Sequence, residues 1–431
     1  MASPRRSFPK PGLNPADLAD ALRRAREVYL PGCAGHSLLF ERWLQEVGDA
    51  AAGATFSGVW IPGVNRFEPC ALHERTRARG IFVGPEQRRG WETGRFEYLP
   101  LHYSEAARWF AAPGRFDLVL LHVAPPDAHG RCSLSLAADF TPAVLQGLAD
   151  GATVLAHVNP RLPRTAGPSV AWSRLDGVVE AEALVLEVAD EAPDATLMAV
   201  ARQVAGLVRD GDTLQLGLGR LQTAVLGVLC GHRGLRAHSG MVSDGLLALR
   251  DAGALAAPAG GVPPVCTGVA LGSAALHAAM ADAELVRFEP VSYTHSQSTL
   301  AALPQLVSIN SALEIDLLGQ VNCETLGGEQ VSGVGGLVDF TRGARASNGG
   351  RAIVAATATA GRHARSRIVP QLAPGAVGVA RTDVDLVVTE QGVADLRHAT
   401  VDARAQALIR IASPAHREAL AEAWRTLRRT F

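Results

Sequence analysis

Short apolar runs recur along this chain, each followed by a glycine-rich or polar turn and then by apolar residues at helical spacing. In REVYLPGCAGHSLLFERWLQEV, residues 26–47, a strand pattern passes through the turn 31–35 into an amphipathic helix pattern. GDTLQLGLGRLQTAVLGVL, residues 211–229, makes the same passage through Gly217, Leu218 and Gly219. Strands that alternate with helices are typical of α/β folds, so the pattern predicts that class.

A second type of unit also occurs twice. FDLVLLHVAPPDAHG and DVDLVVTEQGVADL each place an acidic residue, Asp117 or Asp385, before a buried-strand run that ends in a polar turn. Because the two types follow one another in the same order, they predict a duplicated, open α/β domain. A charged stretch separates the copies, and we expect domains over residues 1–190 and 191–431.

Length and composition are those of a folded globular protein. The 431 residues suffice for two domains, and 48% are hydrophobic while 19% are charged. A formal net charge of −1 gives no electrostatic reason to expect nucleic acid or an anionic membrane as a partner. We expect neither a membrane span nor a secretory signal, since the apolar runs are short and MASPRRSFPKPG lacks an apolar core.

The cysteines and lysines exclude several kinds of chemistry. The six cysteines are scattered without a C-x-x-C pair, so we expect a reduced, cytoplasmic setting without a disulfide framework or a metal site. Lys10, near the N-terminus, is the only lysine. Schiff-base and pyridoxal phosphate catalysis both need a lysine at the active site. Those two enzyme classes are therefore not expected. We expect no permanently bound cofactor of another kind either.

The most unusual stretch is INSALEIDLLGQVNCETLGGEQVSGVGGLVDFTRGA, from Ile309 to Ala344. Alternation predicts a strand with Glu314 and Asp316 on one face. Glycines then follow at high density among Val, Leu and Phe residues, at positions 319, 327, 328, 333, 335 and 336. Glycine in such numbers indicates backbone that bends tightly or lies against a flat ligand. The interleaved apolar residues argue against a flexible linker, and a ligand-binding role is favoured.

This stretch resembles the signature of the acetyl-CoA hydrolase/CoA-transferase family, close to the 4-hydroxybutyrate and acetate CoA-transferases. The resemblance extends from about residue 20 to 425 and includes six further segments: FSGVWIPGVN, LHYSEAARWF, HVAPPDAHGRCSLS, HVNPRLPRT, SRIVPQL and TDVDLVVTEQGVADLR. It implies a class I CoA-transferase-like fold of two similar α/β domains, with the active site in the interdomain cleft. It also implies a homodimer that transfers CoA between a short acyl-CoA and a small carboxylic acid.

In the chemistry that the resemblance implies, a glutamate attacks the acyl-CoA thioester, and two backbone amides stabilise the oxyanion. Those amides would come from Leu218 and Gly335. The glutamate belongs to a stretch of the form H-S-E-M-x-S-D-G, which here is HSGMVSDG, residues 238–245. Gly240 therefore stands where the nucleophile would be, although the neighbouring residues match. Efficient exchange through a glutamyl-CoA intermediate should fail.

Three interpretations of Gly240 stay open. Glu324 or Glu329 could replace the missing carboxylate. Alternatively, water could attack, with His238, Glu324 or Asp244 as the base, and the protein would be an acyl-CoA hydrolase or a related acyl-CoA enzyme. In the third interpretation the protein binds acyl-CoA without turnover.

Other residues are candidates for binding CoA, and each has a structural alternative. Gln320 and Asn322 could bind the thioester or the pantetheine amides, or satisfy backbone groups in a bent segment. Arg342 and Arg367 could bind CoA phosphates or a substrate carboxylate, or lie on the solvated surface. We also assign backbone contacts with CoA to Gly217, Gly219, Gly333 and Gly336. For Asp127 and His129 we favour a hydrogen-bonded turn over catalysis, and for Asp244 a helix cap is an alternative.

Overall fold

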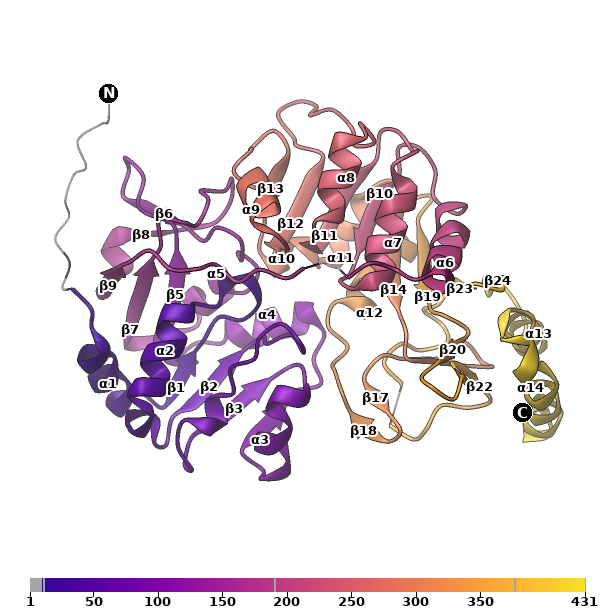
Figure 1. The fold of residues 1–431 in the computed structure, drawn as a ribbon, viewed down its shortest axis with the longest axis horizontal. Coiled ribbons are helices and arrows are strands. Elements are labelled where there is room, and N and C mark those ends of the chain that lie inside the picture. Colours follow the sequence, from indigo (N-terminus) through magenta and orange to yellow (C-terminus); the bar gives the residue numbers. More distant parts are fainter. Residues whose placement is uncertain (1–9, 11, 190, 376, 431) are drawn as a thin grey trace. The chain divides into compact units, whose positions relative to one another are not determined.

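The computed structural model describes residues 10, 12–189, 191–375 and 377–430. This part of the chain forms two compact α/β units (Figure 1). One unit comprises the chain up to Val188 together with Cys266–Tyr293. The other comprises Ala189–Val265 together with the chain from Thr294 onward.

The sheet of the first unit has seven parallel strands in the order β4-β3-β2-β1-β5-β7-β9. Val28 in the middle strand pairs with Phe56 on one side and Leu118 on the other, and all three side chains are buried. Burial on both faces explains the continuous apolar run of the longer strand β5 at residues 118–121. The strands are β1 (Glu27–Tyr29), β2 (Thr55–Gly58), β3 (Arg77–Gly80), β4 (Phe96–Tyr98), β5 (Phe116–Val123), β7 (Leu148–Val158) and β9 (Gly177–Glu180).

Local sequence signals fix the helices of this unit. Asn14 caps the first helix, because its side chain accepts from the amide of Ala16 while Asp17 accepts from the amide of Asn14. Ser37 caps the second helix by accepting from the amide of Phe40. The helices are α1 (Pro15–Arg24), α2 (Leu38–Glu46), α3 (Arg88–Glu92), α4 (Tyr103–Phe110) and α5 (Thr141–Gln146), and β6 (Arg131–Ser133) pairs with β8 (Ser169–Ala171).

The second sheet has eight strands in the order β13-β12-β11-β10-β14-β19-β23-β24, and β24 is antiparallel to its neighbour. Its strands are β10 (Thr213–Leu216), β11 (Arg236–Val242), β12 (Val265–Ala270), β13 (Val286–Phe288), β14 (Leu306–Ser311), β19 (Arg351–Ala355), β23 (Leu386–Thr389) and β24 (Gly392–Asp395). The associated helices are α6 (Ala195–Ala205), α7 (Arg220–Leu229), α8 (Gly245–Asp251), α9 (Ala274–Ala279), α10 (Val291–Thr294), α11 (Gln297–Ala302) and α12 (Leu337–Ala346).

The two sheets share one topology. In each, the first strand lies in the middle, the next three strands add to one side in order, and later strands add to the other side. The prediction of an α/β protein with two similar open sheets is therefore confirmed. The first pair of predicted copies corresponds, since they form β1 and β10. The second pair does not: Asp117 is the second residue of β5, which corresponds to β14, whereas Asp385 precedes β23, which corresponds to β9.

The resemblance between the Asp117 and Asp385 segments has a local cause. Each carboxylate accepts from backbone amides at the start of a neighbouring strand, those of Arg26 and Glu27 for Asp117 and that of Ala352 for Asp385. An acidic residue near the start of a buried strand therefore satisfies backbone amides at the amino-terminal end of the neighbouring strand. It does not mark equivalent strands.

The compact units also differ from the predicted domains in the segment Cys266–Tyr293, which belongs to the first unit although it follows residue 191. Backbone hydrogen bonds explain this difference. The amide of Ala138 donates to the carbonyl of Gly268, and the amide of Phe288 donates to that of Ala166. Such long-range pairing leaves no mark in the local hydrophobic pattern. The boundary at residue 190 itself stays a prediction.

The remaining elements of the second unit lie outside the eight-stranded sheet. A three-stranded sheet has the order β16-β15-β22, and β17-β18 and β20-β21 are hairpins. These elements are β15 (Glu314–Asp316), β16 (Val321–Asn322), β17 (Thr325–Leu326), β18 (Glu329–Gln330), β20 (Thr359–Ala360), β21 (Arg365–Ser366), β22 (Ile368–Val369), α13 (Val401–Ile411) and α14 (Pro414–Leu427). They carry much of the glycine-rich stretch, which is therefore folded structure and not a linker.

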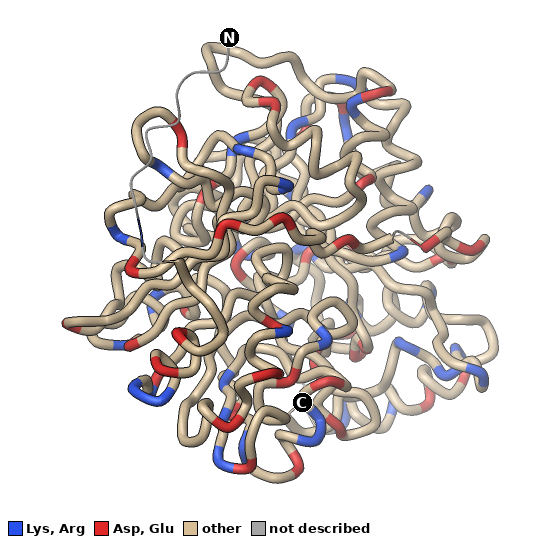
Figure 2. Tube along the Cα trace, turned by 60° about the vertical axis from the view of Figure 1, so that its left-hand side comes forward, with Lys and Arg blue, Asp and Glu red and all other residues tan. Residues whose placement is uncertain are grey.

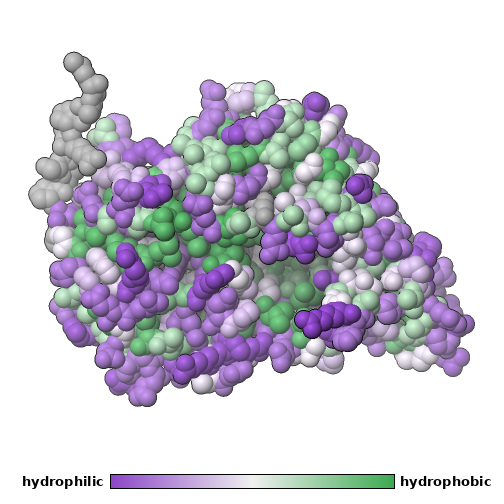
Figure 3. Space-filling model, in the orientation of Figure 1, coloured by the Kyte–Doolittle hydropathy of each residue, from purple (hydrophilic) through white to green (hydrophobic). Residues whose placement is uncertain are grey.

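Charges and apolar side chains are mixed over the surface. Basic and acidic positions are interspersed along the trace in Figure 2. On the face shown in Figure 3, hydrophilic residues surround smaller hydrophobic areas. None of the described helices is both long and apolar enough to cross a membrane.

Candidate active site

The candidate site lies in the second unit, where the strand order changes direction. After β10 the chain adds strands on one side of the sheet, and from β14 onward it adds them on the other. Ligands of open α/β sheets bind at the carboxyl ends of the strands beside such a switch point. A cavity of about 370 Å³ lies there, lined by Leu197, Leu221, Ser311, Ala312, Leu313, Cys323, Val331, Ser332, Ala355, Ala356, Thr357 and Arg367.

Two strand ends, one helix and the glycine-rich stretch supply much of this lining. Ser311 and Ala355 are the paired last residues of β14 and β19, and Leu221 belongs to the helix that follows β10. Val331 and Ser332 directly precede the predicted glycine loop 333–336. The stretch that the sequence singled out for ligand binding thus borders a real cavity. Its size lies at the small end of typical ligand pockets.

Arg367 is the cation of this cavity. Its Nη1 donates to the carbonyl oxygens of Ala312 and Leu313 at 2.8 and 3.2 Å, while its buried Nε has no hydrogen-bond partner in the described structure. Burial lowers the pKa of the guanidinium, and the nearby charge of Glu314 acts in the opposite direction. No ion pair holds this guanidinium within the described residues. An incompletely paired cation in a cavity suits an anionic ligand.

Gly240 lies in β11 and is packed against a histidine that the sequence analysis did not select. A Cβ atom at Gly240 would lie 2.7 Å from Cε1 and 3.0 Å from Nε2 of His295. A Cβ atom at Gly336 would lie 2.5 Å from the same Nε2. The two glycines, predicted from different motifs, therefore form one notch that holds the edge of the His295 ring.

Buried contacts hold His295 in that notch. Its Nδ1 lies 2.9 Å from Oγ1 of Thr294, and its ring lies 4.6 Å from that of Phe340. Burial lowers the pKa of His295 to about 3, and the charge of His238 acts in the same direction. The ring is therefore neutral near pH 7. His238 is itself buried, and its Nε2 donates to the carbonyl oxygen of Thr294 at 3.0 Å.

The other predicted catalytic residues have structural surroundings of their own. The main-chain oxygen of Glu324 accepts from the amides of Val331 and Ser332, and its carboxylate lies 3.4 Å from Nε2 of Gln330. Asp244 occupies the N-cap position of α8, but its side chain makes no capping hydrogen bond. The roles of His238, Glu324 and Asp244 as nucleophile or base stay predictions.

Gln320 and Asn322 organise the backbone around them. The side chain of Gln320 donates to Asp316 at 2.7 Å. Asn322 is fully buried, donates to Glu314 and to the carbonyl oxygen of Thr325, and accepts from the amides of Glu324 and Thr325. These contacts favour the structural alternative for both residues. Their binding of CoA stays a prediction.

We expect Asn322→Ala to lower the free energy of unfolding by about 1–3 kcal/mol, because several buried polar groups lose their partner. Urea denaturation measures this change. If Asn322 only bound the ligand, the substitution would instead raise the KM for acyl-CoA and leave the free energy of unfolding unchanged. That second result would contradict the structural role.

The other residues predicted to contact CoA lie on the surface or in turns before helices. Arg342 is 55% exposed, and its Nε donates to Asp383 at 2.9 Å, so it forms a surface ion pair. Gly219 and Gly335 have φ angles of +111° and +56°, which favour glycine before α7 and α12. Gly217 and Gly333 belong to the same two loops. The oxyanion roles of the Leu218 and Gly335 amides stay predictions.

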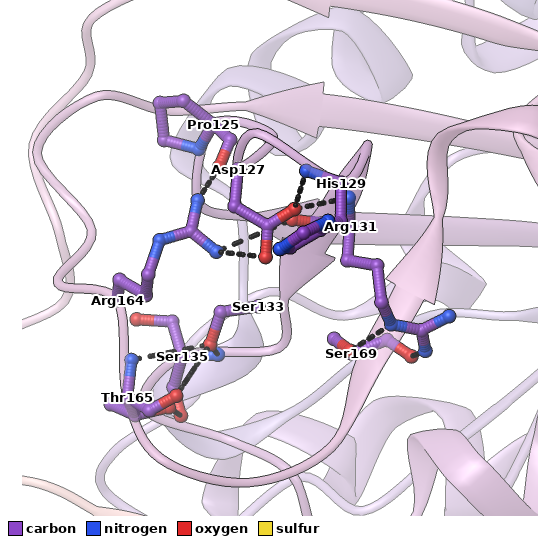
Figure 4. Close-up of polar contacts among 9 residues, drawn as sticks. All are labelled: Pro125, Asp127, His129, Arg131, Ser133, Ser135, Arg164, Thr165 and Ser169. Carbon is purple, nitrogen blue, oxygen red and sulfur yellow. Dashed lines mark hydrogen bonds and ion pairs between the residues drawn. The ribbon is translucent and has the colours of Figure 1, made fainter. Parts of the chain in front are cut away.

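The turn network predicted for Asp127 and His129 is confirmed (Figure 4). Oδ1 of Asp127 accepts from the amides of His129 and Arg131, both at 2.9 Å, and Oδ2 accepts from Arg164 at 3.3 Å. These bonds lower the pKa of Asp127, chiefly through the amide of Arg131. A carboxylate held in this way organises the loop.

Two residues of the site were missed. His295 lies in YTHSQ, which carries no recognisable motif, and only the fold brings it beside Gly240. Cys323 lines the cavity, and burial raises the pKa of its thiol to about 12, so the thiol is protonated near neutral pH. Among the residues that the structure describes, no group of three or more His, Cys, Asp or Glu side chains could hold a metal ion.

Comparisons with known proteins agree with this geometry. The family model for the acetyl-CoA hydrolase/transferase C-terminal domain matches residues 272–424. The 4-hydroxybutyrate coenzyme A transferase of Clostridium kluyveri is 37% identical, over 83% of this chain and 84% of its own length. The succinyl-CoA:cyclohexane-1-carboxylate CoA transferase of Geobacter metallireducens is 32% identical, over 96% and 95%.

Solved structures show the same likeness. The 4-hydroxybutyrate CoA-transferase of Porphyromonas gingivalis has a TM-score of 0.77 at 29% identity, and the match covers 97% of each chain. RipA of Yersinia pestis has a TM-score of 0.87 at 26% identity, over 96% of this chain and 100% of that chain.

Proposed function

The chain belongs to the acetyl-CoA hydrolase/CoA-transferase family, and from that premise we propose that it transfers CoA between a short acyl-CoA and a small carboxylic acid. Both substrates are bound only during turnover, and CoA enters as part of one of them. The relatives named above as CoA transferases support this activity. The cytoplasmic setting, the homodimer and an active site in the interdomain cleft stay predictions.

One observation carries the proposal: the incompletely paired Arg367 in the cavity at the switch point. A CoA transferase must hold a free carboxylic acid, which is an anion near neutral pH. The positive charge of the guanidinium attracts such an anion, and this attraction is strong where water is partly excluded. The rest of the lining is mostly apolar or small, so it suits a short acyl chain beside that anchor.

Hydrolysis is a second candidate because Gly240 offers no carboxylate to receive the acyl group. In that case water attacks the thioester, the C–S bond breaks, and free CoA and acid leave. Hydrolysis needs no second acid, so it gives no role to a cation that would hold an acceptor carboxylate. The transferase is therefore the function that the geometry supports better.

Chromatography of CoA species tests the proposal. The protein is mixed with acetyl-CoA, butyryl-CoA or succinyl-CoA, each with and without a second acid such as acetate, propionate or 4-hydroxybutyrate. We expect a new acyl-CoA that forms only when the second acid is present. Free CoA that accumulates at the same rate without the acid would establish the hydrolase instead, and no change with any pair would refute both activities for these substrates.

A further inference from the structure

The ring of His295 occupies the space in which a side chain at position 240 would begin. We propose that His295 determines the course of the reaction because its ring excludes a carboxylate side chain at position 240. CoA then never becomes attached to the protein, and the exchange takes place directly between the bound thioester and the bound acid. This inference rests on the proposed function.

The distances show why the two positions exclude one another. Carbon and nitrogen atoms of side chains do not approach a Cβ atom within 3.0 Å, yet His295 Cε1 lies 2.7 Å from a Cβ built on Gly240. The ring would have to retreat from Gly240. On its other side the ring already fills the space beside Gly336, where a Cβ atom would lie 2.5 Å from Nε2.

The surroundings also prevent the ring from swinging away. His295 is 2% exposed and packs against Phe340, whose Cε2 lies 3.8 Å from the Cβ position of Gly240. Its Nδ1 is fixed by the fully buried Thr294, whose carbonyl oxygen in turn holds His238. A glutamate at position 240 would therefore displace a buried aromatic residue with several partners.

Electrostatics point in the same direction. The ring in the notch is neutral near pH 7, because burial disfavours its charged form. A carboxylate beside this ring would therefore gain no attraction from a positive charge on it. The notch is thus built for a neutral ring, and Gly240 and His295 depend on one another.

The direct reaction balances without an enzyme carboxylate. An oxygen of the acceptor acid attacks the thioester carbonyl, the C–S bond breaks, and CoA thiolate leaves with the electron pair to give a mixed anhydride. The thiolate then attacks the acceptor's own carbonyl in that anhydride. A new thioester forms, and the original acyl group leaves as a carboxylate. The two acids exchange roles, and no oxidant, reductant or cofactor is consumed.

Intact-protein mass spectrometry after mixing with butyryl-CoA tests the exclusion. We compare the natural protein, Gly240→Glu, His295→Ala and the double variant Gly240→Glu/His295→Ala. A glutamyl-CoA thioester adds the mass of CoA less one water. We expect this gain only in the double variant. Gly227→Glu/His295→Ala is the matched control, because Gly227 lies in α7 with nothing within 4 Å of its Cβ position, and it should gain no mass.

Three outcomes would overturn the inference. The natural protein could itself gain CoA, Gly240→Glu alone could gain as much as the double variant, or a folded double variant that binds butyryl-CoA could gain none. Binding is checked by the rise in melting temperature with butyryl-CoA. If the double variant does not fold, Gly240→Glu/His295→Gly replaces it.

A kinetic measurement on the natural protein needs no variant. Direct exchange requires both substrates together, so reciprocal plots of initial rate against acyl-CoA at several acid concentrations should intersect. Parallel lines would show a CoA-bearing enzyme intermediate and would refute the inference. Failure of the proposed function is distinguishable, since the natural protein would then form no new acyl-CoA at all, while the mass measurements would still report on position 240.

Discussion

Replacing Asp212 by alanine should lower the free energy of unfolding by about 3–5 kcal/mol, the usual cost of leaving one partner of a buried ion pair alone. Asp212 precedes β10, and its fully buried carboxylate pairs with Arg351 at the start of β19, which is 8% exposed. The same carboxylate accepts from the amide of Arg209 at 2.7 Å. Without it, a buried guanidinium lacks its countercharge beneath the strands that form the candidate site. Urea denaturation measures the loss.

Asp395→Ala is the matched control for that experiment. Asp395 also pairs with an arginine, Arg397, but the two side chains are 50% and 44% exposed. Water and salt screen such a pair, so the substitution should cost less than about 1 kcal/mol. Equal costs for the two substitutions would show that burial does not determine the contribution of the Asp212–Arg351 pair.

The fold could be predicted because strand and helix patterns are local. The turn after residue 30 and the turn after residue 216 follow the first strand of each sheet, and the sequence paired them correctly. The pairing of Asp117 with Asp385 was wrong because both acids perform the same local task in strands that do not correspond. The placement of Cys266–Tyr293 depends on hydrogen bonds to distant residues such as Ala138, which no local pattern records.

The candidate site was predictable in part for the same reason. Comparison with a motif shows which position of the motif has lost its usual residue, so the replacement of the glutamate by Gly240 could be recognised. What fills the gap was not visible, because His295 reaches the notch from another part of the chain. The glycine-rich stretch indicated a ligand site, but it could not separate Arg367, which lines the cavity, from Arg342, which forms a surface ion pair. That difference arises from burial and from the partners that the fold brings to each guanidinium.

The same difference makes Arg367 the most informative residue for substrate binding. We expect Arg367→Gln to raise the KM for the acceptor acid about 100-fold, equivalent to about 2.7 kcal/mol, since a hydrogen-bonded charge pair in a partly buried site is lost. The kcat at saturating acid should change much less, because the guanidinium is assigned to binding and not to the bond changes. Initial rates of acyl-CoA exchange over a range of acid concentrations measure both constants.

Arg342→Gln provides the comparison, because it removes an arginine that is exposed and paired with Asp383. It should leave the KM within about twofold of the natural value, since exposed ion pairs contribute little. Arg367 also donates to the carbonyl oxygens of Ala312 and Leu313, so part of its role is structural. A fall in melting temperature with an unchanged KM for the acid would mean that those two bonds are its whole role, and the carboxylate would have to be held elsewhere.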